Sequence, residues 1–169
     1  MALKKAIYSL LVLCLLCSSC SNPDTERAKA IDAARTELKE KPAKSNTAVG
    51  KSNIYLPKGF SAIKDGKNNW ILKRDNQIYL LFILPNEPAG SRTAYELIQE
   101  QKNDYTVLET FESKKEFGYI AIKEKGEVRE VSVGRGGVKL TMETSEKRYS
   151  IDVKEMMKIV HSVREQDGH

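Results

Sequence analysis

Cysteine and histidine are scarce in this 169-residue chain, and their positions restrict the chemistry it can perform. The three cysteines, Cys14, Cys17 and Cys20, lie within the first twenty residues, and the two histidines are His161 and His169. Without cysteine beyond residue 20, the rest of the chain must fold by packing alone, with no disulfide inside it. The usual Cys/His zinc patterns are missing, and Cys/His nucleophilic catalysis is not expected.

The chain also lacks an apolar run long enough to span a bilayer. Ala6 to Leu16 is an uncharged, mostly apolar run of 11 residues, whereas a transmembrane helix needs roughly 20. Lys4 and Lys5 precede this run, and small residues follow it. A charged start, a short apolar centre and a small-residue end are typical of a secretory signal peptide, so we expect this segment to be removed on export.

The end of this segment resembles the lipobox of bacterial lipoproteins, in which small residues precede a cysteine that becomes the mature N-terminus. Ser18 and Ser19 match the two positions before Cys20, although Cys17 stands where the pattern usually has Leu, Val or Ile. The resemblance implies that residues 1–19 are a signal peptide and that the Cys20 sulfur carries a diacylglycerol thioether. Several acyl chains anchor a protein firmly to a lipid bilayer.

Ser21 resembles the residue that permits sorting to the outer membrane in Gram-negative bacteria. The implied localisation is therefore the cell envelope, at the outer membrane facing the periplasm if the host is Gram-negative. Two alternatives stay open from the residues themselves: an ordinary secreted protein with a chance cysteine, and an uncleaved signal anchor.

The charge balance gives no sign of a nucleic-acid partner. The chain has 28 basic and 23 acidic residues, a net charge of +5, and loses two basic residues with the signal peptide. From Asn53 onward the counts are 19 basic and 18 acidic residues. A nucleic-acid-binding domain would carry a clustered basic face, which this near-neutral region does not indicate.

Residues 20–52 are predicted to form a lipidated N-terminus, a polar helix and a flexible tether. Asn22 or Asp24 could cap a helix with Pro23 in its first turn, running to about Glu40. Its apolar stripe is thin, with only Ile31 and Leu38 as large apolar residues, so we expect a solvated or loosely attached helix. Lys41 to Ser52 is typical of a flexible spacer.

Residues 53–169 are predicted to form a small domain that begins with strands. Alternating or apolar segments are separated by turn signals such as Asp65-Gly66 and Arg74-Asp75-Asn76. Ile78 to Leu84 is apolar throughout, which predicts a central strand covered on both faces. The expected strands are Ile54–Leu56, Phe60–Lys64, Trp70–Lys73, Gln77–Leu84, Tyr105–Ser113, Phe117–Lys123, Val128–Val133, Val138–Met142 and a short one at Arg148–Ile151.

Two helices interrupt and end this series of strands. Thr93 with Glu96 resembles a capping box and opens a helix to about Asn103. Asp152 with Glu155 is predicted to cap a C-terminal helix, whose stripe at helical spacing is Val153, Met156, Met157, Val160 and Val163. The order of strands, helix, strands, helix predicts an α+β fold with a mostly antiparallel sheet and helices packed on it.

The domain also resembles the PsbP-like fold shared by photosystem extrinsic proteins and bacterial DcrB-type lipoproteins. The matching segments are Leu56-Pro57-x-Gly59-Phe60 at its start and Ile159-Val160-x-Ser162-Val163 near its end. This resemblance implies a PsbP-like sandwich and a non-enzymatic accessory or binding domain, and it assigns no catalytic residues.

One loop stands out as a candidate anion or partner site. Arg135, Gly136 and Gly137 follow Gly134, and their backbone N–H groups and guanidinium could hold a carboxylate or phosphate. Glycines between two strands more often supply a tight turn, which is the simpler interpretation. His161 is interpreted as a helix-boundary residue. The glutamates between Glu109 and Glu130 are interleaved with lysines and are expected on solvated faces.

These observations predict a membrane-anchored envelope lipoprotein whose non-catalytic domain binds another envelope protein. No metal site and no cofactor are expected, because no loop gathers the converging oxygens of a hard-metal cage. An immunity or inhibitor lipoprotein directed against a toxin or lytic enzyme of the envelope is the first alternative. A hydrolase using Asp/Glu chemistry is the second.

Overall fold

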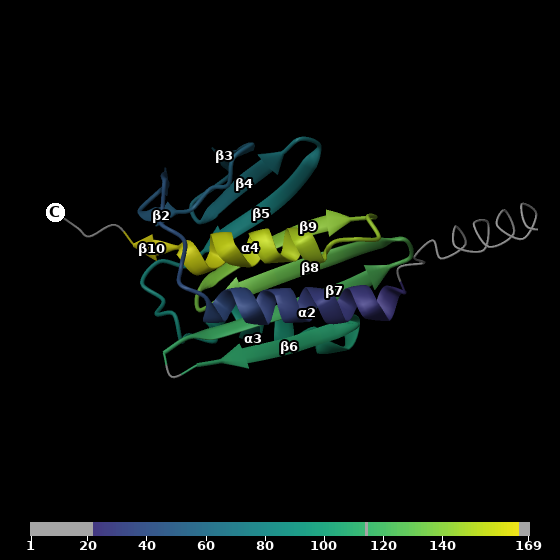
Figure 1. Cartoon of the computed structure of the whole chain (residues 1–169). Helices are drawn as coiled ribbons and strands as arrows, with labels where there is room; N and C mark the ends of the chain where they lie inside the picture. The colour runs from purple at the N-terminus through teal and green to yellow at the C-terminus, as the bar shows by residue number, and fades with distance from the viewer. Residues whose placement is uncertain (1–21, 114, 166–169) are drawn as a thin grey trace, which may run out of the picture.

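The computed structural model describes residues 22–113 and 115–165, which form the predicted α+β fold, with the antiparallel strands divided between two sheets (Figure 1). The large sheet has seven strands in the order β3-β4-β5-β9-β8-β7-β6, and the small sheet has the order β1-β2-β10. The predicted signal peptide (residues 1–19), Cys20 and His169 lie outside the described residues. Within these residues no helix combines the length and apolarity needed to cross a membrane.

Most elements lie where local patterns predict them. The strands of the large sheet are β3 (Phe60–Lys64), β4 (Asn69–Arg74), β5 (Gln77–Ile83), β6 (Val107–Glu112), β7 (Phe117–Lys125), β8 (Val128–Arg135) and β9 (Val138–Thr144). The small sheet consists of β1 (Thr47–Val49), β2 (Ser52–Ile54) and β10 (Arg164–Glu165). The helices are α2 (Pro23–Lys39), α3 (Thr93–Gln99), a 3₁₀ turn η1 (Lys102–Asp104) and α4 (Ser150–Ser162).

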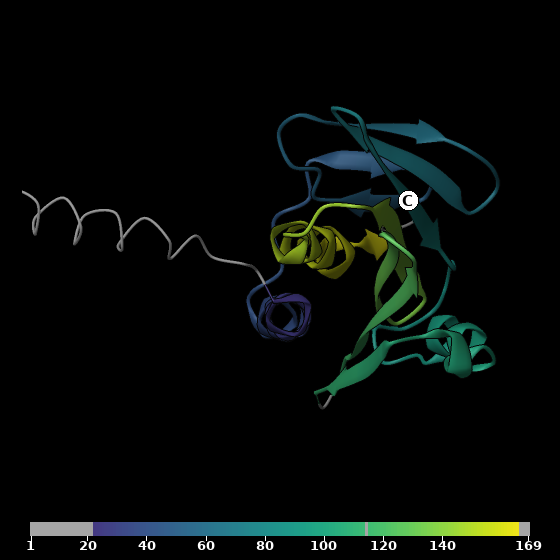
Figure 2. The same cartoon turned by 90° about the vertical axis from the view of Figure 1, so that its right-hand side faces the viewer.

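The helices cover the two faces of the large sheet unequally. Figure 2 shows α2 and α4 side by side on one face and α3 on the other, next to the β6 end of the sheet. The main core lies between the sheet and α4, with Leu72, Leu81, Ile120, Val133 and Leu140 as strand members that are at most 1 % exposed. A second cluster under α3 contains Ile98, Phe117, Tyr119 and Ala121. Among the described residues, no helix lies on the opposite face of β3, β4 and β5.

The predicted stripe of the C-terminal helix is confirmed, but its predicted start is wrong. Val153, Met156, Met157 and Val160 are all buried, which makes the methionines part of the core. The short strand expected at Arg148–Ile151 is absent, because α4 already begins at Ser150.

The predicted cap of this helix is also wrong. Asp152 and Glu155 both bind the guanidinium of Arg74 on β4, which fastens the β3–β5 end of the sheet to α4. The cap comes instead from α2, where the buried Glu26 carboxylate accepts a hydrogen bond of 2.8 Å from the Ser150 N–H. A negative charge at a helix N-terminus is favourable, because it meets unpaired N–H groups and the positive end of the helix dipole.

The central apolar segment is covered on one face only. Tyr79, Leu81 and Ile83 point into the core, whereas Ile78 and Leu80 are 51 % and 54 % exposed. Strand β5 pairs with β4 and β9, so its interior position is confirmed. The prediction of cover on both faces is wrong because α3 lies over β6–β8 and leaves the face of β5 open.

The predicted capping box at Thr93 does not form. Arg92 is the residue before the helix and no side chain caps α3, while the Ser91 hydroxyl accepts from the Thr93 N–H at 3.2 Å. The helix ends at Gln99, and the 3₁₀ turn η1 follows it.

Helix α2 is a structural part of the domain, which corrects the predicted solvated helix and tether. Its range matches the prediction closely, but Ala30 and Ala34 are fully buried against α4 and Leu38 is 7 % exposed. Small residues let two helices approach closely, so the thin stripe suffices for packing. The Arg27 guanidinium also binds Glu124 at the end of β7, at 3.2 Å.

The segment expected to be a flexible spacer is ordered by strand pairing and side-chain hydrogen bonds. Strand β1 pairs with β2, and Val49 belongs to the main core. The Asn46 amide both accepts from the Leu56 N–H at 2.8 Å and donates to the Leu56 carbonyl at 3.0 Å. The Tyr55 N–H donates to the Ser162 hydroxyl at 2.7 Å. The expected domain boundary at Asn53 therefore does not separate two independently packed parts.

A leucine on α2 tests this correction. We expect Leu38→Ala to lower the free energy of unfolding by about 2–5 kcal/mol, because it leaves a cavity in the core. Urea unfolding would measure the loss. The matched control is Leu97→Ala on α3, where the side chain is 53 % exposed and the change should stay within about 0.5 kcal/mol. Equal effects of the two substitutions would contradict the packing of α2.

Candidate functional site

The loop singled out by its glycines is the tight turn of the β8–β9 hairpin. Arg135 pairs with Val138, which leaves Gly136 and Gly137 as the turn residues. Gly136 has a φ of +56°, a conformation that glycine adopts without steric cost. A Cβ at Gly136 would lie 2.5 Å from the Pro88 carbonyl oxygen, and one at Gly137 would lie 2.4 Å from the Glu87 Cβ. The turn and the loop that covers it both require these glycines.

Gly134 has a different role, because it lies within β8 and not in the turn. Its partner on β7 is Tyr119, a fully buried residue. A Cβ at Gly134 would lie 2.2 Å from the Tyr119 ring. The missing side chain makes room for the aromatic ring in the cluster under α3.

The side chain of Arg135 is held by Glu116, the residue before β7. Arg135 is 8 % exposed, and its Nε and Nη2 donate to Glu116 Oε1 at 3.1 and 2.7 Å. Its spacing predicted a solvated face, but the Glu116 side chain is partly buried against Arg135. The two residues are 19 positions apart, and no local pattern marks them as partners.

His161 on α4 lies next to the Arg135–Glu116 pair. It is 2 % exposed, and its Nδ1 lies 3.0 Å from the Glu37 carbonyl oxygen at the end of α2. A carbonyl oxygen only accepts, so Nδ1 carries a proton and donates it. Its Nε2 lies 3.4 Å from Glu116 Oε2. His161 lies in the last turn of α4, so its predicted position at a helix boundary is confirmed, and its buried ring is in contact with α2 and with Glu116.

The environment of His161 favours the neutral ring. Burial lowers its pKa from the ordinary value, and the Glu116 carboxylate opposes this shift without cancelling it. The guanidinium of Arg135 lowers the pKa further. The imidazole is therefore uncharged near neutral pH. With its proton on Nδ1, the ring donates to the Glu37 carbonyl oxygen, and the unprotonated Nε2 cannot donate to the Glu116 carboxylate.

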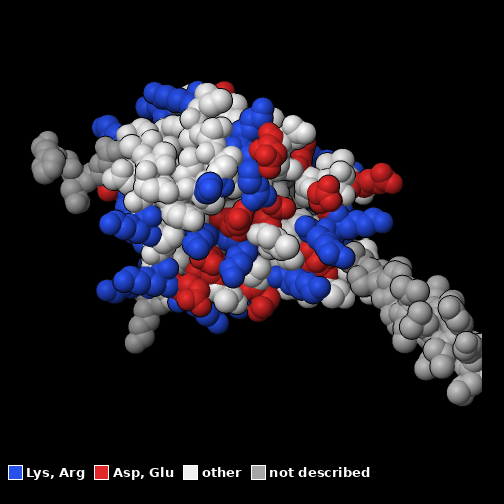
Figure 3. Space-filling model, turned by 45° about the horizontal axis from the view of Figure 1, so that its top comes forward, with Lys and Arg blue, Asp and Glu red and all other residues white. Residues whose placement is uncertain are grey.

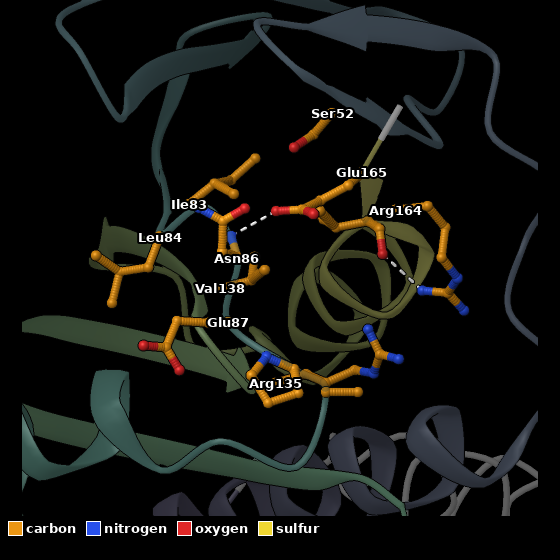
Figure 4. A pocket seen from close by; sticks show the side chains of 12 residues that line it. Ser52, Ile83, Leu84, Asn86, Glu87, Arg135, Val138, Arg164 and Glu165 are labelled. Atoms are coloured by element: carbon orange, nitrogen blue, oxygen red, sulfur yellow. Dashed lines mark hydrogen bonds between the residues drawn. The ribbon is translucent and has the colours of Figure 1, made fainter. Parts of the chain in front are cut away.

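A cleft of about 420 Å³ lies beside this network, between the β5–α3 loop, the hairpin turn and β10 (Figure 4). Leu84, Asn86, Glu87, Arg135, Arg164 and Glu165 are among its lining residues. The Glu165 carboxylate accepts from the Asn86 N–H across the cleft, as the dashed line in Figure 4 shows. Arg164 Nη1 donates to the carbonyl oxygens of His161 and Val163 at 2.9 and 2.6 Å.

The charges around the cleft do not make it a site that is selective for anions. Burial first, and then the nearby Arg135 guanidinium, lower the pKa of Arg164. Glu87 and Glu165 place two carboxylates at the same opening. The charge of Arg135 is already balanced by Glu116, and the Gly136 N–H donates to the Phe117 carbonyl at 2.9 Å. An anion or partner site at Arg135, Gly136 and Gly137 stays a prediction, and the geometry favours the turn.

The other side chains that could act in catalysis or metal binding are not gathered at one site among the described residues. Within residues 22–113 and 115–165, no group of three or more His, Cys, Asp or Glu side chains is arranged to hold a metal ion. Ser61 and Lys64 have the spacing of a Ser-x-x-Lys nucleophile motif, but both belong to strand β3. Residues three apart on a strand point to opposite faces, so they cannot act together.

The open face of the large sheet is the most extensive feature that the sequence did not predict. Ile63, Ile71 and Leu80 lie side by side across β3, β4 and β5, and Ile78 and Phe82 flank Leu80 on the same face. Ile63 is 58 % exposed. Lys73 is the partner of Ile78, and Lys139 is the partner of Phe82, so charged residues border the apolar centre. We call these five apolar residues the open sheet face.

The helix side of the molecule is different in character. Figure 3 shows Lys and Arg side chains interleaved with Asp and Glu across this side, with an uncharged area at its upper left. No large area of one sign is visible there. This pattern does not resemble the clustered basic surface of a nucleic-acid-binding domain.

No protein-family model matches this chain, and no curated protein and no solved structure shows significant similarity to it. The resemblances to bacterial lipoproteins and to the PsbP-like fold therefore stay predictions from the sequence.

Removing the counter-charge of Arg135 should be costly. We expect Glu116→Gln to lower the free energy of unfolding by about 3–5 kcal/mol, because it leaves a buried guanidinium without its carboxylate. The control is Glu112→Gln, whose partner Arg92 is half exposed, and which should cost at most about 1 kcal/mol. Chemical denaturation would measure both. Similar small losses would show that the Arg135 pair does not stabilise the fold.

The buried histidine predicts a pH dependence of stability. Because the folded-state pKa of His161 lies below its unfolded value, about 6.5, the unfolded chain binds the proton more readily. The contribution of His161 to the free energy of unfolding is therefore fully present above its unfolded-state pKa. It is lost as the pH falls through its folded-state pKa. His161→Asn keeps a donor for the Glu37 carbonyl but does not titrate.

The measurement is the free energy of unfolding in urea between pH 7.5 and pH 5. We expect the native protein to lose more stability over this range than His161→Asn, while the carboxylate contributions cancel in the comparison. Parallel curves, or a native protein that gains stability relative to the variant on acidification, would contradict a lowered pKa.

Proposed function

We propose that this protein is a lipid-anchored lipoprotein of the bacterial cell envelope whose α+β domain is not an enzyme and binds another envelope protein. The anchor is supported by the charged start, the short apolar run and the Ser18-Ser19-Cys20 sequence. In this proposal Cys20 carries the lipid, and in a Gram-negative host the domain faces the periplasm from the outer membrane.

The observation that carries the binding role is the open sheet face. Contiguous apolar surface is costly in water and commonly marks a site of interaction. An apolar centre bordered by charges, here Lys73, Lys139 and Glu143, is the arrangement found in protein–protein interfaces. A partner with an apolar surface and charged residues around it would fit this face.

The anchor is tested by the intact mass of protein purified from membranes, with Cys20→Ser as the matched variant. We expect a chain that starts at Cys20 with added acyl mass, and no such modification in the variant. An unmodified chain would reject the lipoprotein assignment.

The binding role is tested in the same membranes with a photoreactive residue at Leu80. We expect a crosslinked protein partner from this position. The same residue at Thr36, which is exposed on α2 in the helix layer, is the control and should give none. If the partner proves to be a toxin or a lytic enzyme, the inhibitor alternative is assigned. No specific product from Leu80 would reject the open sheet face as the binding surface.

A further inference from the structure

The packing of α2 has a consequence for how the domain meets a membrane. Helix α2 begins at Pro23, and Asn22 caps it by accepting from the Asp24 N–H at 3.0 Å. Only Ser21 and Asn22 separate this helix from Cys20 in the sequence. An extended chain covers at most about 3.3–3.6 Å per residue, so the start of α2 lies within about 10 Å of the anchored cysteine.

The first turn of α2 is also fixed to the rest of the domain. Glu26 caps α4 through the Ser150 N–H, and Arg27 binds Glu124 on β7. Ala30 and Ala34 continue the contact along α4. The helix therefore cannot swing away as a tether, and the position of its start determines which end of the domain lies near the lipid.

That end is assembled from three segments that lie together in Figure 1: the start of α2, the β7–β8 turn and the connection from β9 to α4. We call it the proximal end, and it consists of Asn22–Thr25, Lys125–Val128 and residues 145–151. Strand β10 lies at the opposite end of the molecule.

The proximal end carries exposed apolar side chains. Ile151 is 69 % exposed and Val128 is 39 % exposed. Ile151 lies in the first turn of α4, directly after the residue that Glu26 caps. Isolated exposed apolar residues need no explanation in general, but these two lie where the short link places the bilayer.

The charges of the proximal end are balanced. Its exposed basic residues are Lys125, Lys147 and Arg148, and its exposed acidic residues are Asp24, Glu127 and Glu146. Long basic side chains can reach the headgroups while their stems lie along apolar surface. Because the exposed basic and acidic residues are equal in number, the proximal end has no net attraction to anionic lipid. We therefore expect its contact with the membrane to depend little on the salt concentration.

We propose that the proximal end rests on the bilayer surface, with Ile151 and Val128 in the interfacial region, so that the strands rise from the membrane and the cleft at Arg164 and Glu165 faces away from it. This inference rests on the proposed anchoring at Cys20. Its occupant is the lipid surface itself, because the link leaves no room for a protein between α2 and the anchor.

The test uses the full lipidated protein in phosphatidylcholine vesicles. A mature chain that starts at Cys20 has no other cysteine, so an introduced thiol can be labelled alone. Ile151→Cys reports on the proximal end, and Ile63→Cys on the open sheet face is the matched control, since both side chains are more than half exposed. Each thiol receives a fluorophore, and lipids carry a nitroxide quencher at the headgroup.

We expect quenching at position 151 to exceed that at position 63 several-fold and to persist when the salt concentration is raised tenfold. Equal quenching at the two positions in a protein with confirmed acyl mass would overturn the inference and leave the proposed function standing. An absence of acyl mass in the same sample would instead reject the proposed anchor. The same label at position 151 in a chain produced from Ser21 onward, which has no cysteine to carry lipid, should not be quenched, which shows that the contact depends on the anchor.

Discussion

The packing of α2 against α4 is the contact on which the rest of the structure depends. Fully buried Ala30 and Ala34 let the two helices approach closely, and each end of α2 makes a polar contact with α4. At the N-terminal end Glu26 caps α4, and at the C-terminal end the Glu37 carbonyl accepts from His161. His161 Nε2 also lies 3.4 Å from Glu116 Oε2, so the helix pair packs next to the Glu116–Arg135 ion pair of the sheet. Helix α2, which is mostly polar in sequence, thus completes the core.

Local patterns predicted the strands of the large sheet and the turn between β8 and β9, because alternation and glycine positions are decided by neighbouring residues. They failed where the outcome depends on distant partners. The spacing of Asp152 and Glu155 suits a helix cap, but it equally suits two carboxylates on one helix face, and Arg74 on β4 uses them in that way. The thin stripe of α2 indicated solvation, since alanines contribute little to a hydrophobic pattern while permitting close helix packing. The apolar run of β5 indicated cover on both faces, whereas α3 has only seven residues and lies over other strands.

The candidate site shows the same difference between what local patterns predict and what distant contacts decide. The sequence identified the turn at Gly136 and Gly137, but it could not identify Glu116, whose contact with Arg135 is made only when β7 and β8 pair. That contact changes the chemistry expected of the loop, because a guanidinium already balanced by a carboxylate attracts an anion less strongly. The buried network of Glu116, Arg135 and His161 is therefore better explained as a connection between sheet and helices than as a binding centre.

The short link to Cys20 and the open sheet face together restrict how the domain could act. If the proximal end rests on the lipid, the strands rise from the bilayer, and the open sheet face stands to the side of the domain and not beneath it. A partner would then be met laterally, within the height of one small domain above the membrane. A long tether would let the domain search a larger volume, but at the cost of a lower effective concentration near any one membrane-bound partner. With the proposed anchor at Cys20, packing α2 into the core would favour partners that are themselves held at the same membrane surface.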